Sequence, residues 1–202
     1  LRHTDLIVNI SASPFAQEKH KVRVALAKSH ALKNRVPFVY VNQVGGQDET
    51  VFDGQSFLVN RHGKLLVQAA AWHEDLVMLD LDKNASEYRP TITEPIEHVR
   101  QGIIMGLRDF VEKTGNKKVH LGLSGGIDSA VVACLAVDAL GPHRVAGFIL
   151  PGPFNAPESA EDAEQLARNL GIKFFKIDIT KSFESLSALG ETFGLKYDPK
   201  NV

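Results

Sequence analysis

The segment with the clearest chemical potential in this sequence is a glycine-serine turn that reads LGLSGGIDS over residues 121–129. An apolar strand is expected before the turn and a helix over residues 129–140. The adjacent glycines Gly125 and Gly126 allow positive φ and let backbone N–H groups approach an anion closely. The helix points the positive end of its dipole at the same spot, and Ser124 and Ser129 add hydroxyl donors. The segment therefore predicts a phosphate-binding loop.

The loop differs from the common phosphate loop, GxxxxGK[ST], because no lysine follows its glycines. Asp128 instead places a carboxylate where a polyphosphate would lie. That arrangement requires a cation between the two negative groups, and Mg²⁺ prefers oxygen ligands of this kind. The structural alternative is a tight strand-to-helix turn with an acid in the first helical turn, where the helix dipole favours it.

The complete string SGGIDS, in a strand–loop–helix setting, decides between these alternatives. It resembles the SGGxDS loop of the ATP pyrophosphatases. These enzymes split ATP into AMP and pyrophosphate while they adenylate a substrate. The resemblance favours a nucleotide-binding loop over a plain turn.

Composition places the chain among ordinary globular proteins of one to two domains. Its 202 residues carry 23 Lys and Arg against 24 Asp and Glu, so there is no electrostatic case for nucleic acid or an anionic membrane surface as a partner. No apolar run approaches the about 18 residues of a membrane span, and the start lacks the order of a signal peptide. We expect a cytoplasmic protein. Because the chain has no initiator methionine, we also expect it to be an internal piece of a longer protein.

A single cysteine, Cys134, lies among apolar residues of the helix after the loop. It cannot form an internal disulfide or a CxxC metal knuckle, and we expect it to be a buried small hydrophobe rather than a nucleophile. The eight histidines show no zinc-ligand spacing. We expect His20, His30 and His98 to be solvated on polar helix faces.

The first part of the chain is expected to mix strands and one helix. Apolar runs predict strands over residues 6–10, 38–41 and 75–81, and a hairpin of 55–60 and 64–70 around His62 and Gly63. Helical spacing predicts a helix over 17–34. Residues 42–49 are polar, contain glycine and show no period. The polar stretch 82–95 is the best linker, so we expect a first domain over 1–86, a linker over 87–95 and a second domain over 96–202.

The second part alternates strands and helices. A helix over residues 96–111 is expected to pack against the segment that follows it. Near-continuous apolar strands over 119–123, 145–150 and 174–179 alternate with helices over 129–140 and 158–170, which is typical of a parallel sheet covered on both faces. The loop at Ser124 then lies over the carboxyl ends of the strands, where open α/β sheets bind ligands. The proline-rich segment 151–157 is either a wall of that site or a rigid connection.

Both parts of the sequence resemble segments of one family. NISASPF at 9–15, NQVGGQDE at 42–49 and FDGQS at 52–56 resemble the later part of a nitrilase-type glutaminase domain. GLRDFV at 106–111 and LGLSGGIDSA at 121–130 are similar to the opening of an NAD synthetase domain. This order resembles the glutamine-dependent NAD synthetases. It implies an α/β fold: the C-terminal part of an αββα nitrilase-like sandwich, then the start of a doubly wound parallel-sheet ATP-pyrophosphatase domain.

The resemblance implies a ligase with two sites and with ATP and Mg²⁺ as cofactors. A Glu-Lys-Cys triad, expected upstream of Leu1, hydrolyses glutamine, and the ammonia passes to the synthetase domain. There ATP adenylates the nicotinate carboxylate of deamido-NAD, and ammonia displaces AMP to give NAD. Glutamine and deamido-NAD are the expected substrates, in a homo-oligomeric assembly. The fragment alone is expected to be inactive.

The resemblance also carries roles onto individual residues. The loop that holds the ATP phosphates consists of Gly122, Leu123, Ser124, Gly125, Gly126, Ile127, Asp128 and Ser129. In addition, Asp128 is a Mg²⁺ ligand, Leu150 lies near the adenine, and Ser13 and Lys19 contact glutamine. The deamido-NAD contacts and a second Mg²⁺ ligand are expected after Val202. One departure concerns Gly152, Asn155 and Ala156, which stand where the family often has a serine-rich segment.

Three alternatives remain open at this point. Another ATP-pyrophosphatase amidotransferase would adenylate a different carboxylate or carbonyl. A non-catalytic nucleotide-binding or assembly module would bind Mg·ATP without releasing pyrophosphate. A stand-alone amidase is disfavoured, because residues 1–82 contain no thiol and offer no recognisable nucleophile with an activating base.

Overall fold

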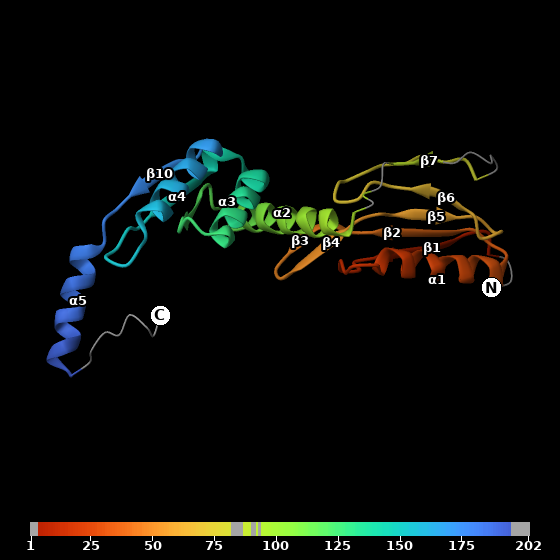
Figure 1. Ribbon diagram of the computed structural model, residues 1–202. Helices are drawn as coiled ribbons and strands as arrows, with labels where there is room; N and C mark the ends of the chain where they lie inside the picture. The colour runs from red at the N-terminus through yellow and green to blue at the C-terminus, as the bar shows by residue number, and fades with distance from the viewer. Residues whose placement is uncertain (1–3, 82–86, 90–91, 93, 195–202) are drawn as a thin grey trace. The chain divides into compact units, whose positions relative to one another are not determined.

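The computed structural model describes residues 4–81, 87–89, 92 and 94–194. Contacts divide the chain into two units, Leu1–Thr114 and Gly115–Val202. Each unit contains its own β-sheet and helices (Figure 1).

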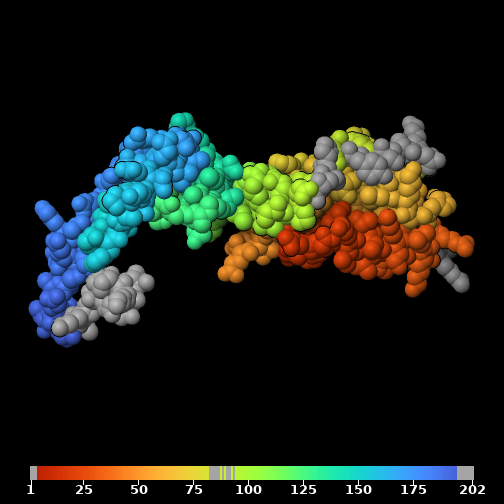
Figure 2. Space-filling model, in the orientation of Figure 1, coloured from red at the N-terminus to blue at the C-terminus, as the bar shows by residue number. Residues whose placement is uncertain are grey.

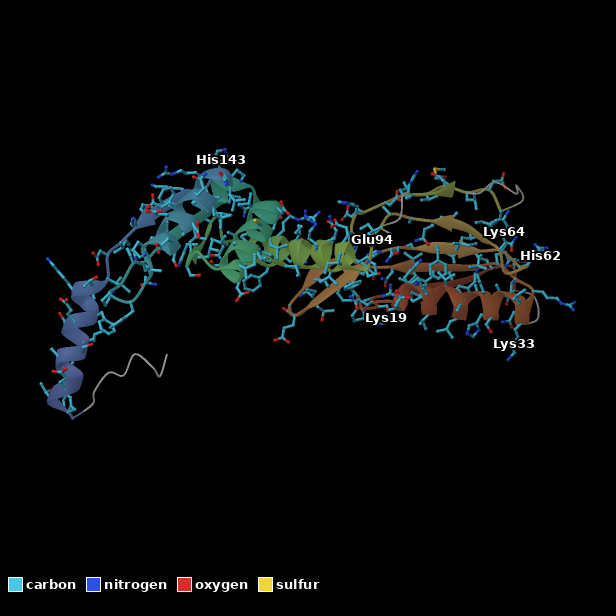
Figure 3. The ribbon with its side chains drawn as sticks, in the orientation of Figure 1. Lys19, Lys33, His62, Lys64, Glu94 and His143 are labelled. Carbon is cyan, nitrogen blue, oxygen red and sulfur yellow. The ribbon has the colours of Figure 1, made fainter. Side chains whose placement is uncertain are left out.

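The first unit is built on a five-stranded mixed sheet in the order β1-β2-β5-β6-β7. Its strands are β1 (Ile7–Ser11), β2 (Phe38–Asn42), β5 (Phe57–Val59), β6 (Leu65–Gln68) and β7 (Glu87–Tyr88). The strands β1 and β2 are parallel, β5 runs antiparallel to both β2 and β6, and β7 is parallel to β6. The predicted strands at 6–10 and 38–41 and the predicted hairpin are confirmed. His62 and Lys64 lie on its turn (Figure 3).

Helix α1 (Lys19–Asn34) connects β1 to β2 and covers one face of this sheet. Its small residues Ala27 and Ala31 are buried against Phe38, Tyr40 and Phe57. Because alanine has a short side chain, the helix can approach the aromatic residues of the sheet closely. In the space-filling view, α1 and the strands next to it form one continuous surface of this unit, coloured red to orange (Figure 2). The predicted helix over 17–34 is confirmed with a start two residues later.

A hairpin and a long helix complete the first unit. Strands β3 (Val44–Gln47) and β4 (Thr50–Asp53) pair antiparallel, although the sequence showed no strand period at 42–49. Glycine explains the difference, because a Cβ on Gly46 would lie 3.3 Å from the Cα of Gly106 in helix α2 (Pro95–Lys113). Gly46 N also donates to Asp109 Oδ2 at 2.7 Å. The glycines of β3 therefore allow a helix to pack closely against the strand, and the strand lacks the usual alternation of apolar and polar residues.

Two further expectations in this unit are corrected. Helix α2 has the predicted position, but it packs on the β3–β4 hairpin, which precedes it in the chain. Residues 75–81 form no strand. Instead Asp75 accepts a hydrogen bond from Ala70 N at 3.0 Å and pairs with Arg89 at 3.1 Å. The predicted linker 87–95 lies partly outside the described residues, and its first two residues form β7.

The second unit contains a parallel sheet in the order β10-β9-β8, which confirms the predicted strand–helix alternation. Its elements in chain order are β8 (Val119–Gly122), α3 (Ile127–Leu140), β9 (Val145–Ile149), α4 (Pro157–Asn169) and β10 (Lys173–Lys176). A short 3-10 helix, Pro142–Arg144, precedes β9, and a helix that was not predicted, α5 (Thr180–Thr192), follows β10. Cys134 is exposed on α3, so the expectation of a buried thiol was wrong. Among the described residues, no helix is long and apolar enough to cross a membrane.

Candidate functional site

The loop between β8 and α3 is anchored by the apolar residue at its start. Leu123 is buried, and its N–H donates to Phe148 O of β9 at 2.8 Å, which extends the sheet pairing by one residue. Its side chain lies over Gly147, where a Cβ would come within 2.5 Å of Leu123 Cδ1. Because Gly147 has no side chain, Leu123 can pack directly on the sheet, and this contact anchors the loop.

Gly125 is required at its position for two independent reasons. Its φ is +80°, in the left-handed region that favours glycine. A Cβ there would also lie 2.2 Å from the carbonyl oxygen of Ser159, in the first turn of α4. The loop and the start of α4 are thus packed backbone against backbone.

The two serine hydroxyls brace the loop from inside. Ser129 Oγ donates a hydrogen bond to Gly126 O at 3.0 Å and accepts one from Ser124 N at 3.2 Å. Ser124 Oγ accepts from Gly126 N at 3.2 Å and lies 3.1 Å from Ser129 Oγ. The first backbone bond of α3 is donated by Ala130 N to Gly126 O. The N–H groups of residues 127–129 therefore precede the helical hydrogen-bond ladder and can bind an anion.

Asp128 lies in the first turn of α3 with its residue exposed. A carboxylate there is compatible with the helix dipole and open to an ion from solution. Within the described ranges no group of three His, Cys, Asp or Glu residues could hold a metal ion. The donor chemistry of Asp128 fits a hard cation, and one protein oxygen suits Mg²⁺, which commonly keeps several waters and binds substrate phosphates.

A cavity of about 230 Å³ lies beside this loop. Its wall includes Gly122, Leu123, Ser124 and Leu150, four of the residues assigned to ATP. Residues 125–129 belong to the loop but do not line this cavity. Pro151 and Asn155 also line it, and Asn155 Oδ1 accepts from Gly152 N at 2.8 Å. The proline-rich segment is therefore a wall of the cavity as well as a connection.

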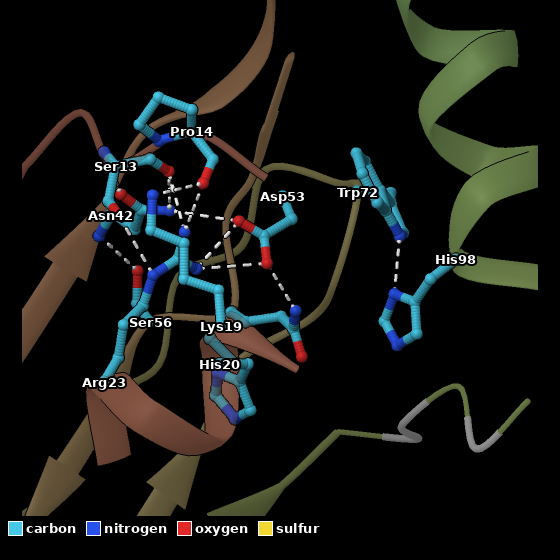
Figure 4. Close-up of polar contacts among 12 residues, drawn as sticks. Ser13, Pro14, Lys19, His20, Arg23, Asn42, Asp53, Ser56, Trp72 and His98 are labelled. Carbon is cyan, nitrogen blue, oxygen red and sulfur yellow. Dashed lines mark hydrogen bonds and ion pairs between the residues drawn. The ribbon is translucent and has the colours of Figure 1, made fainter. Parts of the chain in front are cut away.

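A second polar cluster lies in the first unit, around Ser13 at the end of β1 (Figure 4). Ser13 N donates to Asn42 Oδ1 at 2.9 Å, and Ser13 O accepts from Arg23 Nη2 at 2.8 Å. The side chain of Arg23 is 6% exposed and pairs with Asp53, whose side chain is 2% exposed, at 2.8 Å. Gln55 Nε2 donates to the second oxygen of Asp53 at 2.6 Å. This cluster holds the segment after β1 against α1 and β4.

Lys19 begins α1 and lies next to the same segment (Figure 3). Its Nζ donates to Pro14 O at 3.0 Å. Ser13 and Lys19 line one groove of about 750 Å³ together with Arg23. An ammonium with three donors beside a hydroxyl is suited to an acidic or carbonyl oxygen of a small ligand. The structure thus brings together the two residues that were assigned to glutamine.

Two protein families match successive parts of the chain. Residues 1–90 match carbon-nitrogen hydrolase, and residues 99–198 match NAD synthase. Glutamine-dependent NAD(+) synthetase from Synechocystis sp. is 42% identical over 87% of this chain and 32% of that protein. The enzyme of the same name from Aquifex aeolicus is 39% identical over 92% of this chain and 39% of that protein.

A solved structure agrees with these matches. Glutamine-dependent NAD+ synthetase from Acinetobacter baumannii in complex with ADP superposes with a TM-score of 0.87 at 35% identity, over 98% of this chain and 38% of that one. The chain belongs to the glutamine-dependent NAD synthetase family. It spans about a third of the length of the family members from Synechocystis and Aquifex. The predicted fold class, a nitrilase-like part followed by the start of an ATP-pyrophosphatase domain, is confirmed.

Several residues of this NAD synthetase family member were missed or misjudged from the sequence. No role was predicted for Arg23, which lies on the buried face of α1. His20 was expected to be solvated, but its Nε2 lies 2.9 Å from Gln68 Oε1, and burial lowers its pKa below 6.5. His98, likewise expected to be solvated, accepts from Trp72 Nε1 at 3.1 Å. His30 is exposed, as expected. These residues could not be recognised from local sequence pattern, because each of them contacts a partner far away in the sequence.

Proposed function

We propose that the complete protein forms NAD by ATP- and glutamine-dependent amidation of deamido-NAD through an adenylated intermediate, with release of AMP and pyrophosphate. The observation that carries this proposal is the braced loop at 123–126, with free helix N–H groups and an adjoining cavity, in a chain of this family. We propose the domain limits 1–86 and 96–202, joined by a linker at 87–95.

In the second unit, the N–H groups of residues 127–129 and the loop backbone hold the phosphates that leave as pyrophosphate. The absence of a side chain at Gly122, where a Cβ would meet nothing within 4 Å, leaves room for a ligand. Leu150 lies on the cavity wall, where it would be near the adenine. Asp128 would hold a Mg²⁺ ion, which supplies neutralisation of phosphate charge when bound.

The chemistry that follows is an acyl activation. The deamido-NAD carboxylate attacks the α-phosphorus of ATP and releases pyrophosphate. The resulting mixed anhydride has AMP as a good leaving group, and ammonia displaces it to form the amide. Binding of the leaving phosphates by the loop stabilises negative charge as it develops.

In the first unit, Ser13 and Lys19 bind the glutamine that the complete protein hydrolyses. The ammonia released there supplies the second site. We further propose a homo-oligomer in the cytoplasm, with no nucleic-acid or membrane partner.

The test is Asp128→Ala in the complete protein. Pyrophosphate exchange into ATP that depends on deamido-NAD should fall by at least about 100-fold, the scale of lost transition-state stabilisation, while glutamine hydrolysis persists. Asp162→Ala, an exposed acid on α4, is the matched control and should change neither activity. Loss of both activities in a folded variant, or of neither, contradicts the proposal. Exchange stimulated by a different carboxylate instead of deamido-NAD would assign another amidotransferase.

A further inference from the structure

Arg23 uses its entire guanidinium group within the first unit. Nη1 donates to both oxygens of Asp53, at 2.8 and 3.1 Å. Nη2 donates to Ser13 O at 2.8 Å and Pro14 O at 3.0 Å. Nε donates to Ser13 Oγ at 3.2 Å. These five bonds account for the five N–H groups of an arginine, so Arg23 has no donor left for a ligand.

The direction of the bond to Ser13 Oγ follows from the chemistry of arginine. A guanidinium has donors and no acceptor, so the hydroxyl oxygen of Ser13 must accept. The hydroxyl hydrogen therefore remains available. In the part of the chain that the structure describes, no acceptor is bonded to it, and Ser13 lines the same groove as Lys19.

The backbone of Ser13 is held as firmly as its side chain. Asn42 accepts from Ser13 N at 2.9 Å and donates to Ser13 O at 3.3 Å. The same Asn42 amide lies 3.4 Å from Asp53 Oδ1. Arg23, Asp53 and Asn42 thus fix the position of Ser13, and Arg23 occupies one acceptor position of its hydroxyl (Figure 4).

The charge of Arg23 is neutralised inside the cluster. Asp53 is 1% exposed and its carboxylate also accepts from Gln55. A buried cation paired in this way contributes little attraction to a ligand, whereas Lys19 has an ammonium on the groove. The arginine therefore acts on a substrate only through Ser13.

We propose that Arg23 is a positioning residue for glutamine, because its bond to Ser13 Oγ orients the hydroxyl so that its free hydrogen donates to an acceptor oxygen of the substrate. This inference rests on the proposed function, in which Ser13 contacts glutamine. It assigns to a buried ion pair the role of orienting a single hydroxyl.

The test compares Ser13→Ala, Arg23→Lys and the double variant in the complete protein. A lysine at 23 keeps the charge but cannot bridge Asp53 and both carbonyls. We expect each single variant to raise the KM for glutamine about 10-fold or more, the loss associated with a hydrogen bond to a charged group. The ratio of glutamine-dependent to ammonia-dependent NAD synthesis should fall in parallel. The double variant should resemble Ser13→Ala alone, because Arg23 acts through that hydroxyl.

Arg61→Lys, the same exchange at an exposed site, should leave the KM for glutamine unchanged. All assays are run below the unfolding temperature of the least stable variant. If Arg23→Lys does not fold, Arg23→Met/Asp53→Leu replaces the pair by apolar residues, an exchange that proteins often tolerate. It should show the same rise in KM.

Separate outcomes overturn separate claims. An unchanged KM in Arg23→Lys beside a raised KM in Ser13→Ala overturns the positioning role alone. So do independent, multiplying effects in the double variant. An unchanged KM in Ser13→Ala removes the proposed glutamine contact, and the positioning role with it.

Discussion

The two candidate sites of this chain are made rigid by different means. Around Ser13, buried side chains from α1, β2 and β4 fix the segment, and Arg23 and Asp53 leave few polar atoms unpaired. Around Ser124, backbone geometry makes the loop rigid. The left-handed Gly125 lies against Ser159 O, and the serine hydroxyls hydrogen-bond within the exposed loop.

This difference determines which substitutions each site tolerates. A site that depends on a desolvated ion pair is sensitive to loss of charge, because the remaining partner stays buried without compensation. A site that depends on backbone geometry is sensitive to an added Cβ and insensitive to most distant charge changes. Removal of a buried charge and addition of a Cβ should therefore affect the two sites differently.

Asp53→Ala should give the largest loss of stability in the first unit. Removing one member of a buried ion pair costs about 3 to 5 kcal/mol, and here Gln55 and Asn42 also lose their acceptor. Hydrogen exchange of the amides of α1 should accelerate, while that of α3 stays unchanged. Asp5→Ala, at an exposed residue, is the control. A loss below about 1 kcal/mol, the range of surface ion pairs, would contradict the burial argument.

Gly125→Ala should give the next largest loss, in the second unit. Left-handed strain costs about 1 to 2 kcal/mol and forced overpacking about 1 to 3 kcal/mol, so the start of α4 should shift. Gly122→Ala is the matched control for stability, because a Cβ there meets open space. Thermal unfolding should separate the two variants. If Gly122→Ala weakens ATP binding without loss of stability, the open space is ligand space; equal unfolding temperatures would contradict the packing argument.

A smaller effect concerns His20 and pH. Burial lowers its pKa below the ordinary value of 6.5. The unfolded chain then binds more protons than the folded one just below pH 6.5, so stability is full above that pH and falls as pH decreases toward the folded pKa. His20→Gln should flatten this part of the profile for the first unit, measured by hydrogen exchange of α1. His62→Gln, an exposed control, should not; a profile unchanged by His20→Gln would assign the pH dependence elsewhere.

The surroundings of His20 explain why its pKa is lowered. Gln68 Nε2 donates to Ala69 O, so its Oε1 accepts from His20 Nε2. His20 Nδ1 is buried and has no partner among the described residues. Protonation would bury an additional N–H without an acceptor, which disfavours the charged form.

The strand–turn–helix geometry of the candidate phosphate loop could be predicted from the sequence because its parts are contiguous. Gly125, Gly126 and Asp128 stand within four residues, and the flanking strand and helix have clear periods. The cluster around Arg23 could not, since Asp53 is thirty residues away and an arginine among the lysines and histidines of this helix resembles a solvated one. The local sequence pattern indicates which residues of an element are apolar. It does not indicate which polar groups contact one another across the fold.

The same distinction explains the errors in secondary structure. Strand β3 has no alternation because Gly45 and Gly46 pack against a helix that lies some sixty residues later. Residues 75–81 are apolar enough for a strand, but Asp75 is engaged by Arg89 and the segment pairs with no neighbour among the described strands. In both segments, contacts with residues distant in the sequence determined the secondary structure.

The glycine contact between β3 and α2 has a consequence for exchanging domains between family members. The NAD synthase match begins at residue 99, inside α2, yet that helix packs within the first unit through Gly46, Gly106 and Asp109. A chimaera joined near Pro95 would pair a foreign helix with this hairpin, where any side chain at 106 would press on Val51. A junction at Thr114–Gly115 keeps the helix with its own hairpin and places the seam at a glycine whose Cβ position is unobstructed.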